Sequence, residues 1–165
     1  MTNNLDGQIA ALIQNAPADG TTPNVVAAIA PGLKMIAQQL QHLHYYILQT
    51  PDERWLVTTL SNLSQPHLEK RVIYAYPSLE DASTANSNSN SAGTEATILP
   101  VISILFQIIA IPKLESIIFF DTPGQIESGT EVKKEEIQNL IRSYLQQYKN
   151  NQSRTRSRSI PPDLA

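Results

Sequence analysis

The sequence contains one short stretch, Asp121-Thr122-Pro123-Gly124, that is typical of GTP-binding proteins. In P-loop GTPases a buried strand ends in these residue types, where the Asp organises the Mg²⁺ shell and the Gly amide contacts the γ-phosphate. Such proteins also need a phosphate-binding loop of the form G-x-x-x-x-G-K-[ST]. None of the 6 glycines is followed by Lys, and no N-K-x-D segment is present to recognise guanine. We therefore expect no GTPase activity, and we interpret Thr-Pro-Gly as a turn in which Pro sets φ and Gly accepts a positive φ.

Three histidines, His42, His44 and His67, could ligate a metal ion. Two residues that are two positions apart on a strand point to the same face, and a third His could complete a zinc site with an open position for water. Half-exposed histidines at the start of a strand explain the same pattern without a metal. A small metal-dependent enzyme is therefore the alternative hypothesis, and the leading expectation is that no metal or cofactor is bound.

Other catalytic arrangements find little support in the sequence. The adjacent carboxylates at 52–53, 80–81 and 135–136 are typical of turns and helix ends, and no His or nucleophile accompanies them. Serines are abundant only in segments that cannot position a nucleophile, and no G-x-S-x-G is present. The chain has no Cys, which excludes disulfides and thiolate chemistry. We therefore expect a protein that is not an enzyme.

Aromatic residues are concentrated between residues 45 and 76, where we expect strands. They are Tyr45, Tyr46, Trp55, Tyr74 and Tyr76. Neighbouring residues of a strand face opposite sides of the sheet, so Tyr45 and Tyr46 must separate. One side can then belong to the core while the other presents aromatic rings to solvent or to a partner. These five residues are the candidates for partner binding.

The elements that would position these residues follow from hydrophobic periodicity. Helical spacing covers 5–15 and 24–41, and Pro31 predicts a kink or two short helices in the second segment. The period then changes to two over 42–50, 54–62 and 69–76, which predicts three strands in an antiparallel meander. A strand is expected at 114–121, and apolar residues spaced for one helical face at 137–148 predict a helix over 133–148.

Two segments between these elements are harder to place. Residues 78–96 are rich in Ser, Asn and Ala, and we expect a mobile loop because they bury too little apolar surface to repay their ordering entropy. Residues 97–110 are apolar throughout, with Thr97 as a potential cap and Pro100 in a first turn, and we expect a buried helix. A strand remains open there because β-branched residues are frequent.

Charge and hydropathy narrow the range of partners. The net charge is −3, and residues 151–165, with three Arg and one Asp, carry +2, so residues 1–150 carry −5. A nucleic-acid-binding domain would usually be basic, so we expect no nucleic-acid partner. Residues 96–112 carry no charge, but they are short for a spanning helix and contain two Pro, so we expect no membrane span. The N-terminus has no basic and apolar signal pattern, and we expect a cytoplasmic location.

The order of elements resembles the α+β fold of the bacterial type III secretion chaperones and their YbjN-like relatives. That fold has one further strand before its last helix, and here 122–132 leaves room for a short strand only. The stretch from IIFFDTPG to IQNLI, within residues 113–148, is also similar to small uncharacterised proteins of cyanobacteria. The chaperone resemblance implies a dimeric module that binds an extended segment of a partner, without catalytic residues.

Together these features predict an α+β fold in which an antiparallel sheet, a three-strand meander plus at least one further strand, is packed by helices. The predicted order is α-α-β-β-β-α-β-α, with one domain at 1–150 and a disordered Arg/Ser tail at 151–165. The leading functional hypothesis is a non-enzymatic protein-interaction or chaperone-like module that binds a protein partner, with a homodimer as a possibility.

Overall fold

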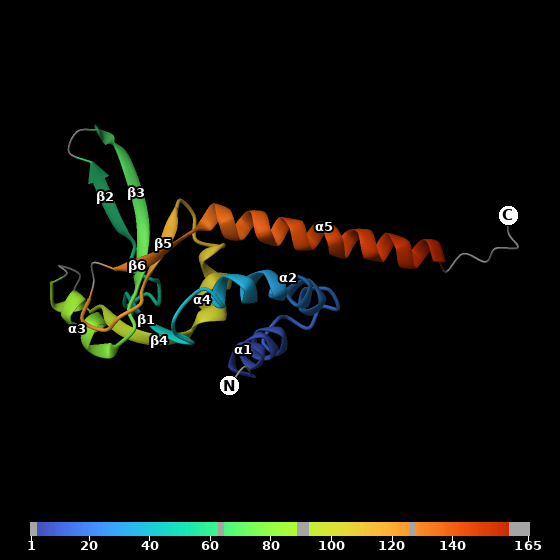
Figure 1. Cartoon of the computed structure of the whole chain (residues 1–165), viewed down its shortest axis with the longest axis horizontal. Coiled ribbons are helices and arrows are strands. Elements are labelled where there is room, and N and C mark those ends of the chain that lie inside the picture. The colour runs from blue at the N-terminus through green and yellow to red at the C-terminus, as the bar shows by residue number, and fades with distance from the viewer. Residues whose placement is uncertain (1–2, 63–64, 89–92, 126–127, 159–165) are drawn as a thin grey trace, which may run out of the picture.

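The computed structural model describes residues 3–62, 65–88, 93–125 and 128–158, of which 3–4, 62, 65–68, 88 and 153–158 are described by their backbone alone. Figure 1 shows the arrangement of the helices and strands. In chain order they are α1 (Asn3–Gln14), α2 (Thr22–Ala37), β1 (His44–Gln49), β2 (Thr58–Asn62), β3 (Gln65–Ala75), α3 (Leu79–Asn88), β4 (Glu95–Pro100), α4 (Val101–Ile108), β5 (Ser116–Phe120), β6 (Gly129–Lys133) and α5 (Lys134–Arg158).

The α+β class is confirmed, and the eight predicted elements occur in the predicted order with α3, β4 and β6 interspersed. One sheet has the order β2-β3-β5-β6, and β1 pairs with β4 in a second, two-stranded sheet. Two isolated β-bridges connect β1 to other segments. Tyr46 pairs with Tyr76, which follows β3, and Gln49 pairs with Trp55, which precedes β2. β3 and β5 run parallel and the other paired strands antiparallel.

The predicted three-strand meander is wrong in one respect, because β1 pairs with β4 rather than with β2. The segment 97–110 supplies that partner, and it is a strand and a helix rather than one helix. Pro100 has φ −64° and ψ 142°, which is extended backbone, and α4 begins only at Val101. A residue before Pro is disfavoured in the helical region, so Leu99 and its β-branched neighbours continue a strand.

The prediction of a mobile loop at 78–96 is also wrong, because α3 occupies Leu79–Asn88. The Ser78 hydroxyl accepts a hydrogen bond from the Asp81 backbone N–H at 3.2 Å, which caps the helix. Ala82 is fully buried beneath it. A cap and a small apolar face therefore form a helix where composition indicated none, and residues 89–92 lie outside the described residues.

The helices predicted by periodicity are present. α2 continues through Pro31 as one helix rather than two. α5 buries Ile137 in the main core and packs against α2, and the rest of its predicted face is half-buried. Gly32 of α2 allows this close packing, since a Cβ there would lie 3.1 Å from the Tyr144 ring. The α5 backbone continues to Arg158, and the remaining part of the predicted tail, 159–165, lies outside the described residues.

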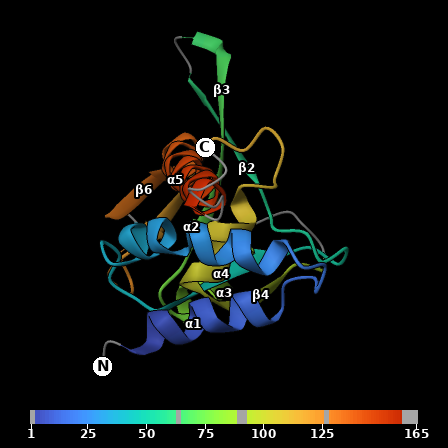
Figure 2. The same cartoon turned by 90° about the vertical axis from the view of Figure 1, so that its right-hand side faces the viewer.

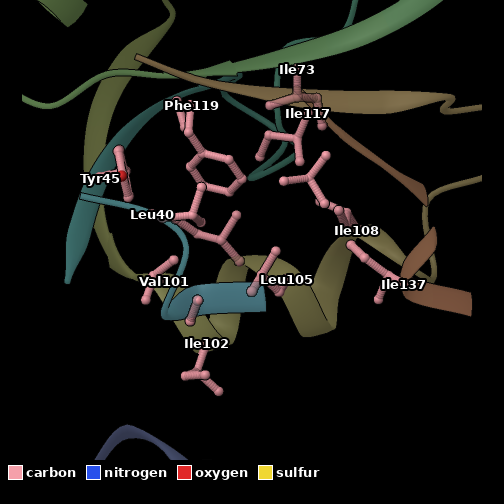
Figure 3. Packing of buried hydrophobic residues seen from close by; sticks show 14 of the residues in the cluster. Leu40, Tyr45, Ile73, Val101, Ile102, Leu105, Ile108, Ile117, Phe119 and Ile137 are labelled. Atoms are coloured by element: carbon pink, nitrogen blue, oxygen red, sulfur yellow. The ribbon is translucent and has the colours of Figure 1, made fainter. Parts of the chain in front are cut away.

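The main hydrophobic core lies between the sheets and the helices α2, α4 and α5 (Figures 1 and 2). Ile102, Ile104, Leu105 and Ile108 of α4 are fully buried, and Figure 3 shows Leu105 and Ile108 facing the strand residues Ile117 and Phe119. Burying each such side chain contributes roughly 1.5–3 kcal/mol. The uncharged segment 96–112 therefore forms most of β4, this core helix and the turns that follow it. Among the described residues, no helix combines the length and the apolar character needed to cross a membrane.

The junction between β5 and β6 generates a stability prediction. A Cβ at Gly129 would lie 3.0 Å from the Phe119 carbonyl oxygen and 3.1 Å from the Phe120 ring. Since a backbone atom cannot move aside cheaply, Gly129→Ala should lower the free energy of unfolding by about 1–3 kcal/mol. Gly7→Ala is the control, because the exposed Gly7 of α1 has nothing within 4 Å of an added Cβ and Ala should raise stability by up to about 1 kcal/mol. Urea denaturation measures both, and equal effects would contradict the assigned pairing of β5 with β6.

Candidate functional site

The strands divide their side chains between the main core and a second face, which we call the outer face. Tyr45 and Ile47 of β1, Ile73 and Ala75 of β3, and Ile117 and Phe119 of β5 belong to the main core. The alternate residues, Tyr46, Leu48, Tyr74, Tyr76, Ile118 and Phe120, form a separate cluster on the outer face with Ala82 and Ala85 of α3. This division follows from the two-residue period of a strand.

α3 covers part of the outer face, on the side of the sheets opposite α2, α4 and α5 (Figure 1). A pocket of about 500 Å³ remains open beside the helix. The residues that line this aromatic pocket are Tyr74, Tyr76, Asp81, Thr84, Ala85, Phe120 and Gly124. Three strand aromatics therefore form one wall of the pocket, and α3 and the turn after β5 form the other.

The aromatic rings of the pocket are in mutual contact. Phe120 stacks on Tyr74 with a centroid distance of 5.6 Å and an interplanar angle of 15°. It also stacks on Tyr76, at 5.4 Å and 28°. Tyr76 and Phe120 are each 7% exposed and Tyr74 is half-buried. Stacking of this kind stabilises aromatic pairs beyond what burial alone achieves, so the three rings form one packed wall of the pocket.

Burial raises the pKa of Tyr76 to about 12, and the neighbouring Tyr74 and the Asp81 carboxylate add smaller contributions in the same direction. Loss of hydration disfavours the phenolate, and a nearby negative charge disfavours it further. The Tyr76 hydroxyl is therefore neutral at physiological pH and is unsuited to act as a general base there.

The Asp-Thr-Pro-Gly segment forms the turn that the sequence predicted. Gln125 N–H donates to the Thr122 carbonyl at 3.1 Å, and Gly124 has φ +83°. Pro at the second position and a positive φ at the third are the signature of a type II turn. The Gly124 N–H donates to both carboxylate oxygens of Asp81, at 3.1 and 2.9 Å. The turn thus binds α3 and closes one side of the aromatic pocket.

Asp121, the residue after β5, forms hydrogen bonds with two other parts of the chain. Its Oδ2 accepts a hydrogen bond from the Thr130 hydroxyl at 3.2 Å, and its carbonyl accepts one from His42 Nε2 at 2.6 Å. These contacts hold the end of β5 against β6 and the segment before β1. Asp121 therefore has a structural role.

The structure describes the side chains of two of the three candidate metal ligands, His42 and His44. His42 lies before β1, donates to Asp121 and packs edge-on against Tyr45 at 5.5 Å, while His44 is exposed at the start of β1. The side chain of His67 lies outside the described residues. Among the described residues there is no group of three His, Cys, Asp or Glu that could hold a metal ion. The alternative hypothesis of a metal-dependent enzyme therefore stays a prediction.

The five candidate aromatic residues separate between the two faces. Tyr45 is fully buried in the main core against Phe119, at 4.8 Å between ring centroids, so it cannot contact a partner. Trp55 is half-buried against the same core. Tyr46, Tyr74 and Tyr76 lie on the outer face, and Ile98, which is opposite Tyr46 in the register, is 52% exposed beside them.

Five residues that line the pocket are not among the candidates from the sequence: Asp81, Thr84, Ala85, Phe120 and Gly124. Phe120 could have been found from its alternation with Phe119 along β5, and Asp81 from its position three residues after Ser78, the spacing of a helix cap. The contact between Asp81 and Gly124 joins residues 43 positions apart, and no local pattern carries that information.

The Tyr76 environment generates a pH prediction. A phenol whose pKa is raised in the folded state, from 10.0 to about 12, stabilises the fold fully below pH 10, and this contribution is lost as the pH rises toward 12. The unfolding midpoint in urea should therefore fall less steeply above about pH 10 in Tyr76→Phe than in the wild type. Parallel pH profiles for the two proteins would show that Tyr76 is not desolvated.

Comparison with known proteins gives no family assignment. No protein-family model matches the chain, and no curated protein matches it significantly.

Proposed function

We propose that this protein is a non-enzymatic interaction module whose outer face binds a segment of a partner protein. The observation that carries the proposal is the aromatic pocket, a hollow of about 500 Å³ with a stacked wall of Tyr74, Tyr76 and Phe120. Tyr is enriched at protein interfaces because it offers a large contact area with little side-chain entropy to lose.

The neighbouring surface extends the pocket. Tyr46 is half-buried, and Ile98 is one of the exposed large hydrophobic residues. Both belong to the two-stranded sheet of β1 and β4. A partner segment that fills the pocket could continue over these side chains, which would remove further apolar area from water. Clustered apolar groups around a preformed pocket are typical of binding hot spots.

The chemistry of the pocket supports binding rather than catalysis. Among its described lining residues there is one carboxylate, no His and no Lys, and the phenol of Tyr76 is held neutral. General acid–base catalysis needs a group that titrates near the working pH within reach of a substrate. The proposal therefore assigns no catalytic residue.

A second hollow offers a weaker alternative. It has a volume of about 530 Å³ and is lined mainly by charged residues of β3, β6 and α5. Lys70 forms an ion pair with Glu131 and lowers the pKa of that carboxyl, and Lys134 Nζ donates to the Ile111 carbonyl. Three of its charged side chains thus have partners within the chain, and charges of both signs line the hollow, so it favours no particular ligand.

Three further expectations from the sequence stay predictions. They are the chaperone-like role, the homodimer and the cytoplasmic location. The chaperone resemblance implies that the partner segment is extended, which suits a pocket at the side of a sheet.

A pull-down from the native host with matched variants tests the proposal. Tyr74→Ala removes a half-buried ring from the pocket, and Leu60→Ala removes an exposed side chain from β2, which projects away from α3 (Figure 1). A partner retained by the wild type should be retained by Leu60→Ala and should bind Tyr74→Ala about tenfold more weakly or worse. Equal thermal unfolding of the two variants controls for folding. Retention of the same partner by all three proteins, or of none by the wild type, would contradict the proposal.

A further inference from the structure

We propose that the aromatic pocket recognises a cationic side chain, arginine or lysine, of the partner polypeptide. This inference rests on the proposed function and specifies the chemistry of its ligand. Asp81 is the charged residue among the described residues that line the pocket, and no Lys or Arg is found among them. An aromatic wall with one carboxylate is complementary to a positive charge on an apolar stem.

The aromatic wall supplies the first part of the recognition. Tyr74 and Phe120 are nearly parallel, at 15°, and the three ring centroids lie within 5.4–6.4 Å of one another. The face of an aromatic ring carries partial negative charge and attracts a cation placed over it. A planar guanidinium also stacks on such faces, and its methylene stem packs against apolar neighbours.

Asp81 supplies the second part. Both oxygens of its carboxylate accept from the same donor, the Gly124 N–H. An ionised carboxylate can accept about four hydrogen bonds. Acceptor positions therefore remain for an ammonium or a guanidinium. The cap by Ser78 fixes the first turn of α3 and hence the position of Asp81. Hydrogen bonds between charged groups are the stronger ones, and they orient a guanidinium in particular.

The overall charge favours the same ligand. Residues 1–150 carry −5, and a negative protein attracts cationic segments during encounter. The chain has cations of its own in Arg154, Arg156 and Arg158. The C-terminal end of α5 lies on the far side of the molecule from α3 (Figure 1). These arginines therefore cannot reach the pocket of the same chain. The tail of a second copy is the competing occupant that the experiment must distinguish.

The test is a titration of the ¹⁵N-labelled full chain with arginine amide, followed by NMR. The Gly124 amide is the reporter because it hydrogen-bonds to Asp81. Citrulline amide is the control, since it has nearly the shape of arginine amide and the same α-amino group but a neutral urea in place of the guanidinium. Arginine amide should shift the Gly124 resonance saturably at millimolar concentration, and citrulline amide should not.

Four variants separate the charge from the aromatic contribution. Asp81→Asn removes the charge but retains an oxygen that can accept from Gly124, whereas Glu80→Gln removes a neighbouring charge that does not line the pocket. Asp81→Asn should weaken the binding of arginine amide about tenfold and Glu80→Gln much less. Tyr74→Phe retains the ring and should bind as the wild type does, while Tyr74→Leu should bind about fivefold more weakly.

The outcomes distinguish the two proposals. If citrulline amide binds as well as arginine amide, or if neither shifts Gly124 while Tyr74→Ala still loses the partner, the cation assignment is overturned and the proposed function stands. If Tyr74→Ala retains the partner as well, both fail. A Gly124 shift that grows with protein concentration and vanishes on replacing Arg154, Arg156 and Arg158 together by Gln would identify a second copy as the occupant and overturn the partner assignment.

Discussion

The alternation of side chains along β1, β3 and β5 is the constraint on which the rest of the structure depends. Each of these strands sends one set of residues into the main core and the other set to the outer face. α4, which is apolar on nearly all sides, fills the core side. α3, with a polar sequence and a narrow alanine face, covers the outer side only in part. The aromatic pocket exists because a bulky aromatic face is opposed by so small a helix.

One hydrogen-bonded contact links the elements that shape this pocket. Asp81 of α3 accepts from Gly124, and Gly124 can present its N–H there because it adopts a positive φ. The Asp-Thr-Pro-Gly segment thus resembles a GTPase motif in sequence while acting as an anchor for a helix. Its glycine amide does bind a carboxylate, but one that belongs to the same chain.

The sequence predicted the features that depend on local periodicity. The amphipathic face of α5, the separation of Tyr45 from Tyr46 and the turn at Pro123 each follow from residue spacing. The predictions that are wrong concern features that depend on contacts between distant segments. The pairing of β1 with β4 rather than β2 is set by a partner far along the chain. The helix at 79–88 combines a local cap by Ser78 with packing of its alanine face against distant strands. The pocket combines both kinds of information. Its two tyrosines are candidates from the sequence, whereas the other lining residues, Asp81, Thr84, Ala85, Phe120 and Gly124, are not.

The most direct test of this account measures which aromatic rings are accessible to solvent. A soluble gadolinium chelate broadens NMR resonances of exposed rings and leaves buried rings sharp. The Tyr74 ring of the outer face should broaden strongly, whereas Tyr45 and Phe119 of the main core, which are 0% exposed, should stay sharp. Protection of Tyr74 equal to that of Tyr45 would show that the pocket is closed and that the outer face presents no aromatic ring to a partner.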